Sequence, residues 1–281
     1  MTNFSPPEHI SFSQWNTYTN CPRNWYLSRV RHAEETQTWF LPIGTAVHQM
    51  IEDQLAGEID SPSAEQVFYP LIQKQMLIEP DTTKWLAGGS KDSPVVEEKA
   101  LRKVKDCFEA AIEFLEDWDV WEVEYDASGR LPGLEPEVKA FVDIIGEYKG
   151  KKKKYHGPGI VDWKSGSKKP GNNFQLETYA ALLPPHFYNI TTKNPLRFNG
   201  WWAMLDPNAS EARPIDLSAV DPAEVGKKYQ EAWRGMKSMQ IQAKKAYMCK
   251  MCFNKDSCME YSGITPQTIY YDRSHIDQPP Y

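Results

Sequence analysis

Two short apolar runs, at residues 138–145 and 159–163, each carry one carboxylate, Asp143 in the first and Asp162 in the second. The connection between them is rich in glycine and lysine, so we expect the chain to turn back there and form two neighbouring strands. Asp143 and Asp162 then lie at one edge of a sheet. Alternation along a strand puts Lys164 on the same face as Asp162, so a cation lies beside the acids.

Two neighbouring carboxylates repel each other unless a positive charge lies between them. A divalent cation with oxygen ligands is the common solution, and the Lys164 ammonium beside it is suited to orient an attacking water and to stabilise charge on a phosphoryl group. The alternative for the Asp162-x-Lys164 triplet alone is an ordinary ion pair within a strand, because such pairs are frequent. The triplet by itself leaves both interpretations open.

Two further patterns accompany the acid pair. Gln175 and Tyr179 are four residues apart, so they share one face of a helix just downstream of the second strand. Gly44-x-x-x-His48 lies far upstream, and His48 is next to an apolar stripe of helical spacing. Together with the two acids and the lysine, these motifs resemble the PD-(D/E)xK nuclease superfamily, specifically its RecB-like and Cas4-like exonucleases.

The resemblance implies a role for each matching residue. His48, Asp143 and Asp162 correspond to metal ligands, for Mg²⁺ or Mn²⁺. Lys164 corresponds to the catalytic lysine, and the helical glutamine and tyrosine correspond to a supporting motif near the substrate. One departure is that Ala140 stands three residues before the first aspartate, where the family often has glycine. A small side chain is kept there, so we treat the difference as minor.

The resemblance also implies a fold and an activity. The expected fold is α/β, with a restriction-endonuclease-like core in which helices flank a central mixed sheet. The expected activity is metal-dependent hydrolysis of DNA phosphodiester bonds by an exonuclease, on single-stranded ends, in recombination, repair or phage DNA processing. Two alternatives are a Cas4-type processing factor for CRISPR adaptation that acts with an integrase, and a non-catalytic DNA-binding subunit.

Four of the five cysteines form a second pattern, with Cys21 near the N-terminus and Cys249-x-x-Cys252-x5-Cys258 near the C-terminus. Three closely spaced cysteines in a reducing compartment indicate a metal site, for which Cys21 is the candidate fourth ligand. Spacing alone leaves structural zinc and a [4Fe–4S] cluster open, and the resemblance favours the cluster. Either metal would join the two ends of one nuclease domain that covers residues 1–281. The fifth cysteine, Cys107, reads as a small core residue.

Charge gives a mixed indication of the partner. The 281 residues carry a net charge of −6, which by itself argues against nucleic acid. However, Lys149 and the run from Lys151 to Lys154 concentrate positive charge in the connection between the two acidic strands. The run is either a solvated loop or a hairpin that contacts phosphates beside the acids. We expect DNA as the partner, with a helicase or integrase partner protein or a homo-oligomer as further possibilities.

The rest of the chain supports a soluble α/β protein. No run of about 18 apolar residues is present, and the first residues lack a secretory signal, so we expect a cytoplasmic protein without a membrane span. A strand at 118–125 brings Glu122 or Glu124 towards the acids, but alternation does not say which. Apolar periodicity and cap residues predict the other elements, which are helices at 10–19, 43–55, 93–115, 173–183 and 221–245 and a strand at 197–204.

Overall fold

A computed structural model describes residues 7–57, 63–86, 89–90, 93–184, 187, 198–209, 214–244, 249 and 251–262. Its centre is a five-stranded sheet in the order β4-β6-β7-β8-β9. The β7–β8 pair is parallel and the other pairs are antiparallel, so the sheet is mixed. The strands are β4 (Trp118–Asp126), β6 (Phe141–Tyr148), β7 (Gly157–Lys164), β8 (Asn199–Met204) and β9 (Ile215–Asp216).

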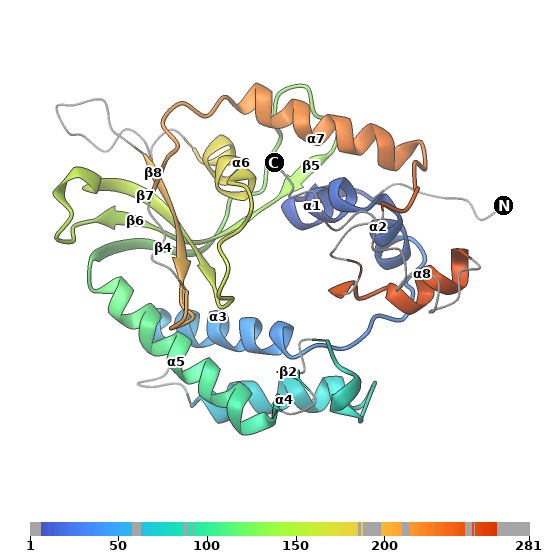
Figure 1. The fold of residues 1–281 in the computed structure, drawn as a ribbon. Coiled ribbons are helices and arrows are strands. Elements are labelled where there is room, and N and C mark those ends of the chain that lie inside the picture. The colour runs from blue at the N-terminus through green and yellow to red at the C-terminus, as the bar shows by residue number, and fades with distance from the viewer. Residues whose placement is uncertain are drawn as a thin grey trace, which may run out of the picture.

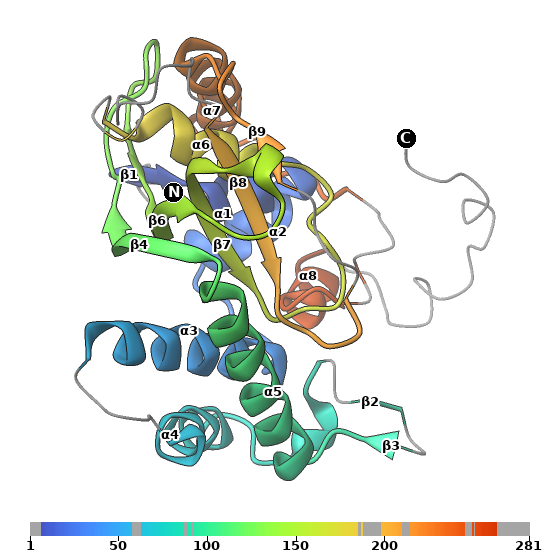
Figure 2. The ribbon, with the colours of Figure 1, turned by 90° about the vertical axis from the view of Figure 1, so that its left-hand side faces the viewer.

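Helices cover both faces of the sheet (Figures 1 and 2). The helices α3 (Phe40–Ala56), α4 (Ala64–Met76) and α5 (Glu97–Leu115) share one core with Ile144, Val161 and Trp201. The helix α6 (Phe174–Leu182) packs on the opposite face, against Ile145, Ile160 and Trp202. Trp201 and Trp202 thus point to opposite faces, as strand alternation requires. The predicted α/β fold, a central mixed sheet flanked by helices, is confirmed.

The third core joins both ends of the chain. It contains α1 (Phe12–Asn20), α2 (Pro22–Arg29), part of α6 and α7 (Pro222–Lys237). The C-terminal helix α8 (Lys255–Ser262) lies against α2 (Figure 1). The remaining elements are short, namely β1 (His9–Ser11), β5 (Glu137–Lys139), β2 (Gly89–Ser90), β3 (Ser93–Pro94) and the 3-10 turns at Thr82–Lys84 and Lys153–Tyr155.

The first predicted helix, at 10–19, begins at Phe12 in the structure, because Ile10 belongs to β1. Ser11 precedes α1, and its Oγ accepts a hydrogen bond from the Gln14 backbone N–H at 3.3 Å. That bond satisfies one of the helix's free N–H groups, which is why serine favours this position. Cys107 is fully buried in α5, as expected for a small core residue.

Two predicted helix ends were wrong. Ser93 and Pro94 form the short strand β3, and α5 begins at Glu97. The helix α7 ends at Lys237, because Met239 adopts a left-handed conformation with φ of 52°. The Gln240 N–H then donates to the Gly235 carbonyl at 3.0 Å, which closes the helix as glycine usually does. Residues 197 and 245, which bound two predicted elements, lie outside the described residues.

Candidate metal centre

Neighbouring strands deliver the two predicted aspartates to one place. Ile144 of β6 pairs with Val161 of β7, so Asp143 and Asp162 are opposite each other one residue further along this antiparallel pair. Both side chains are buried, with 7% of Asp143 and 2% of Asp162 exposed. Asp143 Oδ2 accepts a hydrogen bond from the Trp163 N–H at 2.7 Å. The spacing of the two apolar runs therefore brought the acids together as the sequence indicated.

A β-bulge in β4 decides which glutamate joins them. The pairing of β4 with β6 shifts by one residue between Val120 and Glu122, and Val123 then pairs with Ile144. Glu124 follows and is therefore opposite Asp143; without the shift, Val123 would hold that position. Glu124 also has φ of 48°, a left-handed backbone conformation that costs a non-glycine residue about 1–2 kcal/mol. Bulges and such strained residues occur often at functional sites.

His48 reaches the same acids from the helix α3. Its Nδ1 lies 3.6 Å from Asp143 Oδ1 and 3.9 Å from Glu124 Oε1. One ligand atom of each of these three residues lies within 4.8 Å of the others, and about a third of the His48 and Glu124 side chains is exposed. This group, which we call the His-Glu-Asp group, is open to solvent at His48 and Glu124.

Lys164 lies beside Asp162, with its ammonium in an ion pair with Oδ2. The side chains of α6 complete the arrangement. Lys164 Nζ donates to Gln175 Oε1 at 3.4 Å, Gln175 Nε2 contacts the Tyr179 hydroxyl at 2.6 Å, and that hydroxyl donates to Asp162 Oδ1 at 3.3 Å. The four residues therefore form a closed ring of polar contacts. Trp202 lies under it, its ring 5.0 Å from Lys164 Nζ, and the sequence did not suggest this contact.

The charges in this site are strongly coupled. Burial, followed by the neighbouring Asp162 charge, raises the pKa of Asp143 from 3.8 to about 8. Burial alone would lower the pKa of His48, but Glu124, Asp143 and Asp162 outweigh it and raise that pKa. Burial also raises the pKa of Tyr179 well above its usual range, so its hydroxyl stays a hydrogen-bond donor. The three carboxylates of Glu124, Asp143 and Asp162 thus outnumber the positive charges of Lys164 and a protonated His48.

The residues present fit a hard divalent cation. One imidazole nitrogen and carboxylate oxygens are the donors that Mg²⁺ and Mn²⁺ accept, and a cation would offset the cost of ionising Asp143. Asp162 Oδ2 is buried and, among the described residues, accepts no hydrogen bond, although Lys164 pairs with it. The sequence named His48, Asp143 and Asp162 as ligands; the tight group in the structure holds Glu124 where the sequence left the choice of glutamate open.

The cysteines lie apart from this site, where α2 meets the residues before α8. Burial, with smaller effects from Cys21, Cys249 and Cys258, raises the pKa of the Cys252 thiol to about 11. In the described part of the chain, however, no three of these thiols lie within 4.8 Å of one another. The cysteines are thus neighbours without forming a closed ligand set.

Amide side chains hold the cysteine segment on α2. Asn254 is fully buried, and its Nδ2 donates to Asn24 Oδ1 at 2.9 Å and to Ser28 Oγ at 2.6 Å. The Cys252 thiol also donates to Asn24 Oδ1, at 3.4 Å. The sequence gave no indication of this link between residues 230 positions apart.

Comparison with protein families identifies the superfamily of the chain. The model of the PD-(D/E)XK nuclease superfamily matches residues 9–259. The chain belongs to this superfamily. Membership indicates a metal-dependent nuclease with DNA as its substrate, and it confirms the predicted resemblance at the level of the superfamily. A search of curated proteins finds no match. No helix in the described residues is long and apolar enough to cross a membrane.

Proposed function

We propose that this chain is a Mg²⁺- or Mn²⁺-dependent deoxyribonuclease of the RecB-like and Cas4-like kind, which removes nucleotides from single-stranded DNA ends. The observation that carries the proposal is the meeting of His48, Glu124 and Asp143 within 4.8 Å, next to the buried Asp162–Lys164 pair. A structural ion pair needs neither the histidine nor the third acid. The ordinary interpretation of the D-x-K triplet therefore explains less of the site.

Each residue has a task in phosphodiester hydrolysis. His48, Glu124, Asp143 and Asp162 supply the nitrogen and oxygen ligands for the cation. When bound, the divalent cation acts as a Lewis acid on the phosphate and lowers the pKa of a coordinated water. Lys164 is placed to orient the attacking water and to stabilise the negative charge that develops on the phosphoryl oxygens.

The residues of α6 keep Lys164 in place. Gln175 accepts from its ammonium, and Tyr179 holds the far oxygen of Asp162, so the lysine and the aspartate keep a fixed relative position. Gln175 and Tyr179 are positioning residues in this scheme, because they affect the reaction only by holding Lys164 and Asp162 in place. Their loss should slow cleavage less than the loss of Lys164.

Cleavage of DNA labelled at either end tests this proposal. Wild-type protein, Asp162→Asn and Lys164→Gln are compared with Mg²⁺, with Mn²⁺ and without a divalent cation, and Lys237→Gln on α7 serves as a surface control. We expect cation-dependent loss of label with wild type and the control, and a loss of at least about 100-fold in both site variants. Cleavage by Asp162→Asn at the wild-type rate would refute the assignment. Wild type that binds DNA but never cuts it would favour the non-catalytic subunit.

The same assay examines the finer parts of the proposal. Shortening from one end only, on single strands only, supports a single-strand exonuclease and gives its polarity. Internal cuts in a circular single strand would instead identify an endonuclease. A Cas4-type role requires an integrase partner, so cleavage that depends on adding an integrase would separate that role from a stand-alone nuclease.

We further propose that Cys21, Cys249, Cys252 and Cys258 hold a [4Fe–4S] cluster. Tetrahedral zinc with Zn–S bonds of about 2.3 Å requires all four sulfurs within about 4 Å of one another. The other three thiols each affect the pKa of Cys252, so the four cysteines share one neighbourhood, and the resemblance to the iron–sulfur members of the family favours the cluster over zinc. Iron, sulfide and zinc contents of anaerobically purified protein test the proposal, with Cys107→Ala as the control for Cys258→Ala. Stoichiometric zinc without iron would refute it.

A further inference from the structure

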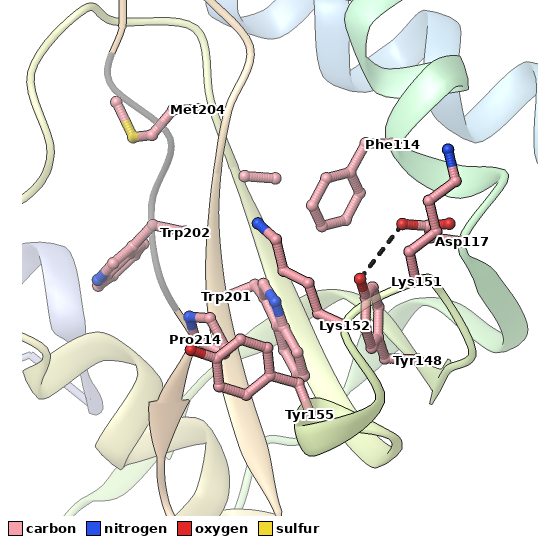
Figure 3. Close-up of a pocket in the computed structure, with 11 residues that line it drawn as sticks. Phe114, Asp117, Tyr148, Lys151, Lys152, Tyr155, Trp201, Trp202, Met204 and Pro214 are labelled. Atoms are coloured by element: carbon pink, nitrogen blue, oxygen red, sulfur yellow. Dashed lines mark hydrogen bonds between the residues drawn. The ribbon is translucent and has the colours of Figure 1, made fainter.

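A pocket extends from the β6–β7 turn and the end of α5 along β8 to Trp202 and Met204, which pair with Asp162 and Lys164 of the candidate metal centre (Figure 3). Its volume is about 270 Å³, slightly below the range of about 300–1,000 Å³ of common small-molecule sites. This is room for one planar ring system, and the phosphates attached to it would have to stay outside. We call it the turn pocket.

The rim of the turn pocket is basic. Lys151, Lys152, Lys153 and Lys154 are all exposed on the turn, in a protein whose net charge is −6. Lys149 differs, since its ammonium is paired with Asp119 at 2.6 Å and with Glu147 at 3.5 Å. Among the residues that the structure describes, Lys151, Lys153 and Lys154 have no carboxylate partner. Four adjacent ammonium groups repel one another, so this surface favours a polyanion.

Aromatic side chains form the walls. Phe114 and Tyr155 are half-buried and line the pocket together with the buried Trp201, and in Figure 3 these three side chains surround that of Lys152. The Lys154 ammonium lies 4.6 Å from the centre of the Tyr155 ring. Lysines around flat apolar surfaces are the usual composition of sites that stack single-stranded bases while holding the phosphates.

One wall of the pocket is polar. Asp117 lines it, and the Tyr148 hydroxyl donates to Asp117 Oδ2 at 3.3 Å, as the dashed line in Figure 3 marks. The carboxylate keeps further acceptor positions. Carboxylates accept from the exocyclic amines of bases such as cytosine, whereas thymine offers no amine. A negative charge here also disfavours a phosphate inside the pocket, so the pocket suits a base and the rim suits its phosphates.

The strand geometry sets the distance from the lysines of the turn to the metal centre. The turn precedes Gly157 at the start of β7, and Asp162 is five residues further along the same strand, which is about 17 Å at 3.3 Å per residue. The lysines therefore lie at the far end of the strand that carries Asp162, and a strand of DNA has to extend along β7 to reach both. A stacked strand rises about 3.4 Å per nucleotide, so this distance corresponds to roughly five nucleotides.

We propose that the turn pocket is a second DNA-binding site, in which the pocket holds one base of a single strand and the turn lysines hold phosphates roughly five nucleotides from the bond at the metal centre. The ligand is single-stranded DNA, because a base paired in a duplex cannot enter the pocket. Bases with an exocyclic amine fit best. The inference rests on the proposed function only in taking DNA as the substrate.

Binding is measured without a divalent cation, so that no strand is cut. The basic variant Lys151→Gln/Lys153→Gln/Lys154→Gln is compared with Lys74→Gln/Lys99→Gln/Lys227→Gln, which removes three exposed lysines elsewhere. With a 12-nucleotide oligo(dC), we expect the basic variant to bind at least about tenfold more weakly than the control. The slope of log affinity against log salt should fall by about 2, because each lost contact with a single strand contributes about 0.7. With a 4-nucleotide oligomer, which cannot span both sites, the two variants should bind equally.

The preference of the turn pocket for particular bases is tested separately. Wild type should bind oligo(dC) more tightly than oligo(dT), Asp117→Asn should lose that preference, and Tyr155→Ala should weaken binding of 12-mers by about tenfold. Equal affinity of the basic variant and the control, or equal losses on 4-mers and 12-mers, would overturn the proposal. So would a preference for duplex DNA. Wild type that shows the length-dependent binding but cleaves no DNA with Mg²⁺ or Mn²⁺ would refute the proposed function and still support DNA binding at the turn pocket.

Discussion

Replacing Asp143 by asparagine should stabilise the metal-free protein. Asparagine has the same shape, and its side-chain oxygen can still accept from the Trp163 N–H. It carries no charge, so it removes the cost of burying a carboxylate beside Asp162. This prediction concerns the fold alone, and it holds whatever the enzyme cleaves.

The magnitude follows from the pKa of Asp143, which is raised from 3.8 to about 8. Below the unfolded pKa, such an acid is protonated in both states and costs no stability. As the pH rises towards the folded pKa, the unfolded state loses the proton that the folded state keeps, and the protein becomes less stable. For Asp143 this window runs from about pH 4 to about pH 8. At about 1.4 kcal/mol per pKa unit, the loss is on the order of 1–2 kcal/mol at pH 5 and a few kcal/mol at pH 7.

Denaturant unfolding of cation-free protein at pH 5 and pH 7 measures this difference. The gain of Asp143→Asn over wild type should increase with pH and reach about 2–4 kcal/mol at pH 7, the lower figure allowing for the lost attraction to His48. Asp126→Asn on the same sheet is the matched control. Its carboxylate is exposed and its pKa is lowered by Ser128, so that substitution should give no gain. A variant that is no more stable than wild type at pH 7, or a gain that shrinks with pH, would refute the reasoning.

Three further predictions follow from other sites. Glu124→Gln should weaken Mn²⁺ binding at least about tenfold in calorimetric titration while Glu122→Gln leaves it unchanged, because the bulge in β4 turns only Glu124 to the metal centre; equal effects would contradict this. Asn254→Ala should lower the free energy of unfolding by about 2–3 kcal/mol, since it removes the donor to Ser28 and leaves Asn24 with only the weak Cys252 thiol, and a loss below about 0.5 kcal/mol would show that the link contributes little. His32 is exposed with φ of 48°, so His32→Gly should raise the melting temperature by a few degrees, equivalent to about 1 kcal/mol, whereas His32→Ala should not.

The acidic pair and its lysine were predictable because each depends on local rules. Alternation places Asp162 and Lys164 on one face whatever the rest of the chain does, and antiparallel pairing of two adjacent runs brings Asp143 opposite Asp162. The helical spacing of Gln175 and Tyr179 is equally local. These positions follow from the period of the secondary structure, so the sequence alone could locate them.

The choice of Glu124 as the third acid and the position at which α7 ends each depend on one backbone irregularity. One extra residue in β4 exchanges the faces of Val123 and Glu124, and no side chain in that strand signals the bulge. Met239 ends α7 in a conformation that glycine usually adopts. The apolar residues of helical spacing continue to Ala243, so the sequence did not reveal this end. The lysines lie in the connection between β6 and β7, as the sequence indicated, but a sequence does not show how far the tip of a loop is from a given side chain.

The link between α2 and residue 254 has a consequence for how the protein is made. Asn24 leaves the ribosome 230 residues before Asn254, its hydrogen-bond partner. At about 5–20 residues per second, α2 then waits roughly 10–50 s for the segment that covers it. During that time the nuclease sheet can already assemble, since all its strands lie between the two partners. The face of α2 that meets Asn254 is therefore covered only after α6 and α7 have been made.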